Sequence, residues 1–249
     1  MTGAYETLVQ LNELLTPNMR RVVLGGPGLQ HFPPDQESGY IKLMVPSDGD
    51  EAQQRAPVAR SFTIRAYDPE HTTLTLQAVD HGDLGPASTW LHRAAPGDVV
   101  TIRGPGARKL ADPRADWFLF AGDMSALPAI AVNLEQLPPD AQGYAFLEVL
   151  DAADRQPLRA PPGIEIRWLV NPDADAPNAM LVDAVLGCPW QTGSAYVWFA
   201  GEFEAMRRVR RYFRDGRSLE PPQYYVSCYW KHGASDEEMK VAKRADPEA

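Results

Sequence analysis

The chain has 249 residues, of which 44% are hydrophobic and 23% are charged, a composition that excludes disorder as the default expectation. Its 24 lysines and arginines against 33 aspartates and glutamates give a net charge of −9, which argues against a general binder of nucleic acid or of anionic membranes. At about 150 residues per domain, the length favours two domains or one large one.

The start of the chain and its cysteines favour a cytoplasmic protein. Residues 1–15 have no basic segment and carry Glu6 and Glu13 where an export signal would be apolar. Because no apolar run approaches the roughly 18 residues of a spanning helix, we expect no membrane insertion. Cys188 and Cys228 lack the spacing of a metal site, so we expect no protein-bound metal. One disulfide between them stays open, but two isolated thiols fit a reducing cytoplasm better.

The pattern of residues 18–106 predicts short strands separated by turns. Residues 73–76 alternate polar and apolar side chains, as a half-buried antiparallel strand does. The glycines of residues 25–28 follow a strand, and we interpret them as a turn, since a dinucleotide fingerprint would need a helix immediately afterwards. Five or six such strands indicate a small antiparallel barrel. The strands expected are 20–26, 40–46, 59–67, 72–80 and 98–105.

After residues 104–116, which are rich in glycine, proline and charge, the pattern changes to continuous apolar runs with helical segments between them. Such runs are typical of strands buried on both faces, and their alternation with helices predicts a doubly wound parallel sheet. The strands expected are 117–121, 145–150, 164–169, 196–200 and 224–230, and the helices are 126–137 and 203–214. The sequence therefore predicts two domains, 1–112 and 113–249, with a C-terminal tail outside the core.

The first candidate site is the strand segment "RSFTIR", residues 60–65. Along a strand Arg60 and Phe62 project to one side, whereas Ser61 and Thr63 project to the other. A guanidinium for pyrophosphate, a ring for packing and a hydroxyl donor are the groups that a flavin dinucleotide needs. An ordinary barrel strand with solvated arginines is the competing interpretation.

The second candidate site is "VDHGDLGPASTWL", residues 79–91. Gly82 and Gly85 allow close approach of the backbone to a ligand, and Pro86 suits the first turn of a helix. Unpaired N–H groups at a helix start, with the Ser88 hydroxyl beside them, make an anion site. The alternative is a capped loop in which His81 bonds to the backbone.

Taken together, these segments resemble the signatures of the siderophore-interacting proteins, the flavin-dependent ferric-siderophore reductases. The motifs "RSFTIR", "HGDLGPASTW", "GPG" at 104–106 and "AGDMSALPAI" at 121–130 occur in the family's order, between "LTPNMRRVVLGG" near the start and "YVWFAGE" and "YW" near the end. The resemblance covers residues 15–232. It implies an N-terminal FAD-binding barrel followed by a C-terminal NAD(P)H-binding α/β domain, and NADPH or NADH as the electron donor.

The resemblance also implies roles for individual residues. Thr63 is expected near the N5 edge of the flavin, and Lys42 at the anionic ferric siderophore. The remaining cofactor contacts implied are Arg60, Ser61, Phe62, His81, Asp83, Gly85, Pro86, Ala87 and Ser88 for FAD, and Asp123, Ser125 and Glu202 for the nicotinamide. Of the latter, Ser125 is expected to cap the helix that follows it. Asp123 and Glu202 follow strands, where plain turns are the alternative.

Three departures from the family pattern bear on these roles. Phe62 stands where tyrosine is usual, and "DMSA" replaces a more usual acidic residue and threonine. Gly106 takes the place of an arginine thought to meet the iron chelate, so we expect Arg108 and Lys109 to substitute for it. Lys231 is a further expected contact with the chelate. Each of these cations is open to interpretation as an ordinary solvated side chain.

The implied activity is reduction of chelated Fe(III) to Fe(II) in the cytoplasm. Because NAD(P)H gives two electrons as a hydride and iron takes one, a flavin is the natural converter between them. Two alternatives stay open: a flavoprotein of the same fold that takes electrons from a ferredoxin, and a siderophore-binding module without catalysis. Four arginines of residues 207–211 offer a contact for a 2′-phosphate, but a solvated helix face is the interpretation favoured for them.

Overall fold

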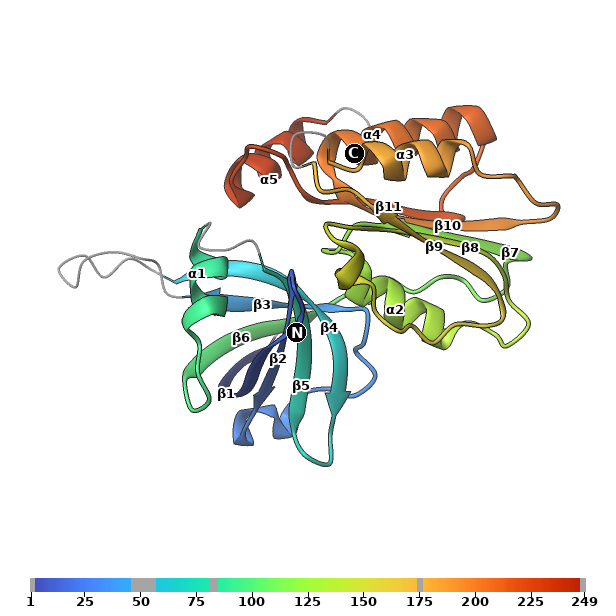
Figure 1. Cartoon of the computed structure of the whole chain (residues 1–249). Helices are drawn as coiled ribbons and strands as arrows, with labels where there is room; N and C mark the ends of the chain where they lie inside the picture. The colour runs from blue at the N-terminus through green and yellow to red at the C-terminus, as the bar shows by residue number, and fades with distance from the viewer. Residues whose placement is uncertain (1–2, 46–56, 81–84, 174–176, 247–249) are drawn as a thin grey trace. The chain divides into compact units, whose positions relative to one another are not determined.

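The computed structural model describes residues 3–45, 57–80, 85–173 and 177–246. It divides the chain into two compact units, Met1–Lys109 and Leu110–Ala249, each with its own sheet and core (Figure 1). The division falls slightly before the boundary expected after residue 112.

Six antiparallel strands close into a barrel in the N-terminal unit, in the order β1-β2-β5-β4-β3-β6. One strand, β1, lies outside the expected set, although it pairs with both β2 and β6 and so closes the barrel. Only two of its side chains, Thr7 and Val9, are buried, so its apolar signal is weak. The strands are β1 (Gly3–Thr16), β2 (Met19–Gly25), β3 (Tyr40–Val45), β4 (Val58–Asp68), β5 (Thr73–Val79) and β6 (Val99–Gly106).

Alternating side chains fill the barrel. On β3, Ile41 and Leu43 are fully buried, whereas Tyr40 is exposed and Lys42 is only partly buried, as the period of two requires. A short 3-10 helix (Pro27–His31), with Leu29 buried, follows the glycines after β2. Because no α-helix begins there, the expectation of a turn in place of a dinucleotide fingerprint holds. The helix α1 (Pro86–Arg93) packs Leu91 into the same core.

Five parallel strands form the sheet of the C-terminal unit, in the order β11-β10-β7-β8-β9. Every residue of the central strands β7 and β10 is buried, which accounts for their continuous apolar sequences. Helix α2 covers one face of the sheet, and α3 and α4 cover the other, so the doubly wound arrangement is confirmed (Figure 1). The strands are β7 (Trp117–Gly122), β8 (Gln142–Val149), β9 (Gly163–Val170), β10 (Ala195–Glu202) and β11 (Tyr224–Trp230), and the helices are α2 (Leu127–Gln136), α3 (Ala179–Leu186) and α4 (Phe203–Arg211).

The C-terminal tail differs from expectation because it joins the core. The last helix described is α5 (Asp236–Ala245). The unit also contains a 3-10 helix, Ala152–Asp154, and a π-helix, Tyr212–Gly216, which extends α4. Met239 of α5 is only 9% exposed and belongs to the core beside β11. Arg210 of α4 is buried too, with its Nη1 2.9 Å from Asp246 Oδ2. The expectation of a wholly solvated arginine face is therefore wrong for Arg210.

Two further findings concern the chain as a whole. Cys188 and Cys228 are both buried free thiols, and burial raises the pKa of each to about 11. Across the described residues, the helices are too short or too polar to span a membrane.

Candidate functional site

One face of the barrel gathers basic and hydroxyl side chains from three neighbouring strands. In the antiparallel register, Lys42 of β3 lies opposite Ser61 of β4 and Arg103 of β6, and Tyr40 lies opposite Thr63. Residues directly opposite one another project to the same side of a sheet, here away from the core. Lys42 Nζ donates to Ser61 Oγ and lies 5.6 Å from the centroid of the Tyr40 ring. We call Tyr40, Lys42, Ser61, Thr63 and Arg103 the outer barrel face.

Two further residues of the "RSFTIR" segment, Arg60 and Phe62, project to the opposite side of β4. Phe62 lies opposite Ile41 and packs, partly buried, against the barrel core. Arg60 lies opposite Leu43, near the start of the strand, and its Nη1 donates to the Ala59 carbonyl at 3.2 Å. The alternation expected along this segment is thus confirmed, with a register shift after Ile64.

The start of α1 lies at the same end of the barrel as Arg60. Because β4 and β5 pair antiparallel from Asp68–Thr73 to Ile64–Leu76, the beginning of β4 is next to the end of β5, where the chain continues to α1. Pro86 occupies the first turn as expected, and Gly85 is the N-cap, with φ of 90° and open space where a Cβ would be. His81 and Asp83 lie outside the described residues.

Two buried features complete this helix start. Ser88 and Thr89 are only 6% and 8% exposed, so their side chains do not stand open at the helix end as the sequence suggested. Asp80, which follows β5, accepts from Arg20 Nε at 2.7 Å, and its Oδ1 lies 2.5 Å from His92 Nε2. This carboxylate joins β2, the end of β5 and the last turn of α1.

The two residues expected to replace the family's arginine, Arg108 and Lys109, both bond to the loop that precedes β3. Arg108 Nε donates to the Glu37 carbonyl at 3.1 Å, and the Lys109 carbonyl accepts from Ser38 Oγ at 3.2 Å. A Cβ on Gly106 would lie 2.2 Å from the Tyr40 ring. Tyr40 therefore fills the space that a side chain at position 106 would need.

At the carboxyl end of β7, Asp123 organises the turn into α2. Its Oδ1 accepts from the Ser125 backbone N–H at 2.9 Å and from Ser125 Oγ at 2.5 Å. Its Oδ2 accepts from Trp230 Nε1, at the end of β11, at 2.7 Å. The expectation that Ser125 caps α2 is wrong: Ala126 is the N-cap residue, and the Ser125 hydroxyl turns back to Asp123 because a carboxylate is the stronger acceptor.

At the carboxyl end of β10, Glu202 is the N-cap of α4. Its Oε2 accepts from the backbone N–H groups of Glu204 and Ala205 at 2.6 and 3.2 Å, and its Oε1 accepts from His232 N at 3.1 Å. Glu202 N donates in turn to Asn178 Oδ1 at 2.8 Å. Glu202 thus joins α4 and the segment after β11 through its carboxylate, and the start of α3 through its backbone N–H.

Glu148, at the end of β8, does for α3 what Glu202 does for α4. Its Oε1 accepts from the backbone and side-chain nitrogens of Asn178, both at 2.9 Å, and its Oε2 accepts from Leu181 N at 3.3 Å. Burial raises the pKa of Glu148, while the bonds from Asn178 oppose that shift. We call Asp123, Glu148, Asn178 and Glu202 the crevice network.

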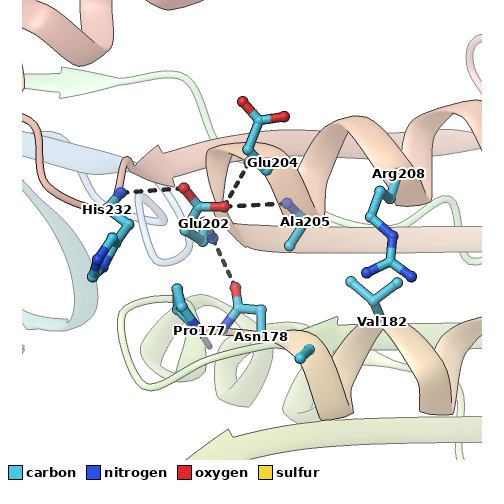
Figure 2. Close-up of a pocket in the computed structure, with 9 residues that line it drawn as sticks. Pro177, Asn178, Val182, Glu202, Glu204, Ala205, Arg208 and His232 are labelled. Carbon is cyan, nitrogen blue, oxygen red and sulfur yellow. Dashed lines mark hydrogen bonds between the residues drawn. The ribbon is translucent and has the colours of Figure 1, made fainter. Parts of the chain in front are cut away.

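The crevice network is contiguous, and a pocket opens beside it. A Cβ on Gly201 would lie 2.4 Å from Asn178 Oδ1 and 3.2 Å from Asp123 Oδ2, so only glycine fits between them. A pocket of about 280 Å³ lies between the starts of α3 and α4 (Figure 2). Its lining includes Asn178, Val182, Glu202, Glu204, Arg208 and His232.

Two residues of the site, Glu148 and Asn178, were not predicted from the sequence. One predicted residue, Lys231, has a different partner from the one expected. Glu148 is the lone carboxylate in the apolar run 145–150, a signal that points to a buried acid with a partner. Asn178 has φ of 59°, a conformation that asparagine tolerates at a helix start, but its sequence neighbours gave no sign of it. Lys231 Nζ lies 3.6 Å from Glu204 Oε1 and 4.6 Å from the centroid of the Phe203 ring, so a carboxylate already accompanies it.

Comparison with family models matches both units. The model of the siderophore-interacting FAD-binding domain matches residues 8–55 and 50–109, and the model of the siderophore-interacting protein matches residues 115–233. The two matches together cover most of the chain.

Individual relatives agree with these matches. The ferric vibriobactin reductase ViuB of Vibrio cholerae is 32% identical over 237 residues, which are 90% of this chain and 88% of that protein. The crystal structure of the siderophore-interacting protein SipS from Aeromonas hydrophila has a TM-score of 0.87 and 31% identity, covering 99% of this chain and 98% of that one. A siderophore utilization protein from T. fusca has a TM-score of 0.83 and 31% identity, with 94% and 95% covered.

Proposed function

The chain belongs to the siderophore-interacting protein family, and we propose that it reduces siderophore-bound Fe(III) to Fe(II) with FAD as cofactor and NADPH or NADH as donor. The observation that carries this proposal is the meeting, at one end of one barrel, of the Arg60–Thr63 strand and the helix start at Gly85. The ferric vibriobactin reductase activity named for the relative ViuB supports it.

The residues of the barrel fit FAD. The first N–H groups of α1 and the guanidinium of Arg60 suit a pyrophosphate, and the open space at Gly85 allows the backbone to approach it. The partly exposed ring of Phe62 and the hydroxyls of Ser61 and Thr63 are available for the flavin ring system. We assign Thr63 to the N5 edge, and Ala87 and Ser88 to the phosphate end with Pro86. When bound, FAD would convert a two-electron hydride donor into a source of single electrons.

The C-terminal unit would hold the nicotinamide dinucleotide at the carboxyl edge of its sheet, the usual ligand crevice of such folds. There Asp123 keeps Ser125 and Trp230 in place through both of its oxygens. Glu202 keeps the start of α4 and the segment at His232 in place through its two carboxylate oxygens. Since these carboxylates are already engaged, we infer that they orient the crevice and that Ser125 and Trp230 meet the nicotinamide.

The outer barrel face would receive the iron chelate. Lys42 and Arg103 are adjacent cations there, and they supply local positive charge despite the net charge of −9. Arg108 and Lys109 lie close by in sequence to β6, and we assign them to the rim of the same site. One NAD(P)H would leave as NAD(P)⁺ plus a proton, while two Fe(III) chelates each take one electron.

We further place this reaction in the cytoplasm. Both cysteines are free thiols, as is usual for proteins in a reducing compartment, and the donors NADPH and NADH are available there.

Colour and iron release test the proposal. Purified protein should be yellow, with an absorbance band near 450 nm from bound flavin, and with NADPH or NADH it should produce Fe(II) from a ferric siderophore, trapped by ferrozine. Colourless protein that still binds the chelate would leave only a siderophore-binding module. Yellow protein whose flavin is bleached slowly by both nicotinamides, but fast by a reduced ferredoxin, would make a ferredoxin the donor.

A further inference from the structure

The pocket between α3 and α4 has the size of one end of a dinucleotide. Its volume of about 280 Å³ falls just below the roughly 300 Å³ at which pockets begin to enclose a whole small-molecule ligand. It is continuous with the crevice network, because Asn178 and Glu202 line it and Gly201 brings Asn178 against Asp123. A ligand that lies along the crevice can therefore extend into this pocket.

The two helix starts at the pocket are already neutralised from within. Glu148 accepts from the N–H groups of Asn178 and Leu181 at the start of α3. Glu202 accepts from those of Glu204 and Ala205 at the start of α4. Helix starts of this kind would otherwise attract a phosphate. An anionic group in this pocket must therefore be bound by a side chain.

Arg208 is the side chain placed to do so. Figure 2 shows its guanidinium turned from α4 towards Val182 of α3, across the pocket, whereas the Glu204 carboxylate is turned the other way. Glu204 is accompanied by Arg207 at 3.4 Å and by Lys231 at 3.6 Å. Arg208 Nη2 lies 3.8 Å from Asp183 Oδ1, and both side chains are more than half exposed, so this pair is weak and easily exchanged.

Two neighbouring arginines of α4 pair with a carboxylate outside the pocket. Arg210 is buried against Asp246, and Arg207 lies 3.6 Å from the same carboxylate. Of the arginines at 207, 208, 210 and 211, Arg208 alone lines the pocket. The lining also has an apolar part, from Ala179, Val182 and Ala205, which suits the flat face of an adenine.

We propose that this pocket takes the adenosine end of the nicotinamide dinucleotide and that Arg208 binds its 2′-phosphate, so that NADPH is preferred to NADH. The inference rests on the proposed function and names its donor. An arginine near the ribose is the arrangement by which doubly wound folds accommodate a 2′-phosphate, and a guanidinium binds a phosphate with two parallel hydrogen bonds.

Nucleotide fragments test the assignment without any redox reaction. Titration calorimetry on the protein as purified would compare 2′,5′-ADP with 5′-AMP, which lacks the 2′-phosphate. We expect 2′,5′-ADP to bind roughly 10- to 100-fold more tightly, the range of a hydrogen bond to a charged group. Arg208→Gln should abolish that difference and leave the affinity for 5′-AMP unchanged.

Arg211→Gln is the matched control, since it removes the same charge from an exposed position of the same helix outside the pocket. It should keep the preference for 2′,5′-ADP. Arg208→Lys, which keeps a charge but loses the fork, should retain part of it. Equal binding of both fragments by the unmodified protein, equal loss for both in Arg208→Gln, or the same loss in Arg211→Gln would each overturn the assignment.

These outcomes are distinct from failure of the proposed function. A protein that prefers 2′,5′-ADP through Arg208 but releases no Fe(II) from a ferric siderophore would retain the assigned pocket and lose the assigned substrate. A protein that releases Fe(II) with NADH and NADPH alike would keep the substrate and lose the assigned role of Arg208.

Discussion

In the crevice of the C-terminal unit, Glu148 and Glu202 both bond to Asn178 and to helix starts, whereas Asp123 bonds to Ser125 and Trp230. All four residues of the crevice network are buried. On the outer barrel face of the N-terminal unit, Tyr40, Ser61 and Arg103 are exposed, and Lys42 is partly so. The crevice is complete before any ligand arrives, because its carboxylates already have donors. The barrel face instead presents cations and hydroxyls at the surface, with Lys42 bonded to Ser61 beside the exposed Arg103. Changes in the crevice should therefore act on stability, and changes on the barrel face should act on binding.

The largest expected effect is on the stability of the crevice. Glu148→Ala leaves the N–H groups of Asn178 and Leu181 buried without their acceptor, which should lower the free energy of unfolding by about 3 kcal/mol. Glu204→Ala is the control, because that carboxylate is exposed and should change stability by less than about 0.5 kcal/mol. Urea unfolding measures both. Similar losses in the two variants would show that the crevice is not internally organised.

The next effect concerns how well the C-terminal unit shields its two buried thiols from a reagent. Both cysteines lie in it, and burial raises their pKa to about 11, against an ordinary value of 9.0. At pH 8 the thiolate fraction of each buried cysteine should be roughly 100-fold lower than that of an ordinary cysteine. A thiol reagent should therefore label native protein slowly and unfolded protein fast. Labelling should speed up about tenfold per pH unit towards pH 11. Fast labelling of native protein at pH 8 would contradict a closed unit.

A smaller effect is expected on the barrel face. Lys42→Ala should raise the KM for an anionic ferric chelate by about tenfold and leave flavin reduction by NADPH or NADH unchanged, since the lost charge is assigned to the chelate and not to the nicotinamide. Lys240→Ala, a lysine of α5 in the other unit, is the control and should change neither. If Lys42→Ala slowed both half-reactions equally, the barrel face would not be a chelate site.

The smallest effect tests the link between Asp123 and Trp230. Asp123→Asn keeps one acceptor oxygen but not two, so either Ser125 or the indole N–H loses its partner, at a cost of about 1 kcal/mol. Tryptophan fluorescence and urea unfolding would detect the change. Ser125→Ala, which removes only the hydroxyl, should leave the fluorescence as it is. An unchanged spectrum in Asp123→Asn would mean that this bond does not hold Trp230.

The sequence predicted the architecture well where one physical signal dominated. Continuous apolar runs marked the sheet, because strands buried on both faces have no polar side, and the turn residues marked most of the barrel. It missed β1, whose burial is limited to Thr7 and Val9 although backbone pairing on both edges makes it essential to closure. Such pairing leaves little trace in the side chains of a mostly exposed strand.

Site residues were harder to predict, because their partners come from distant segments. Ser125 looked like a cap from its neighbours, but Asp123 competes for its hydroxyl. Arg210 looked solvated from helical spacing, but Asp246 lies against it. Asn178 had no local signal, since its role depends on Glu148 and Glu202, 30 and 24 residues away. The motifs of the barrel, by contrast, are local in sequence and could be recognised as such.

The central claim is that electrons pass from a nicotinamide through a flavin held by this chain to siderophore iron. Anaerobic stopped-flow spectroscopy at 450 nm tests it most directly, with NADPH mixed first, a ferric siderophore second, and ferrozine to count the Fe(II) formed. We expect bleaching by NADPH, recovery of the band on addition of the chelate, and two Fe(II) for each NADPH consumed. Bleaching without recovery, or recovery without Fe(II), would contradict it.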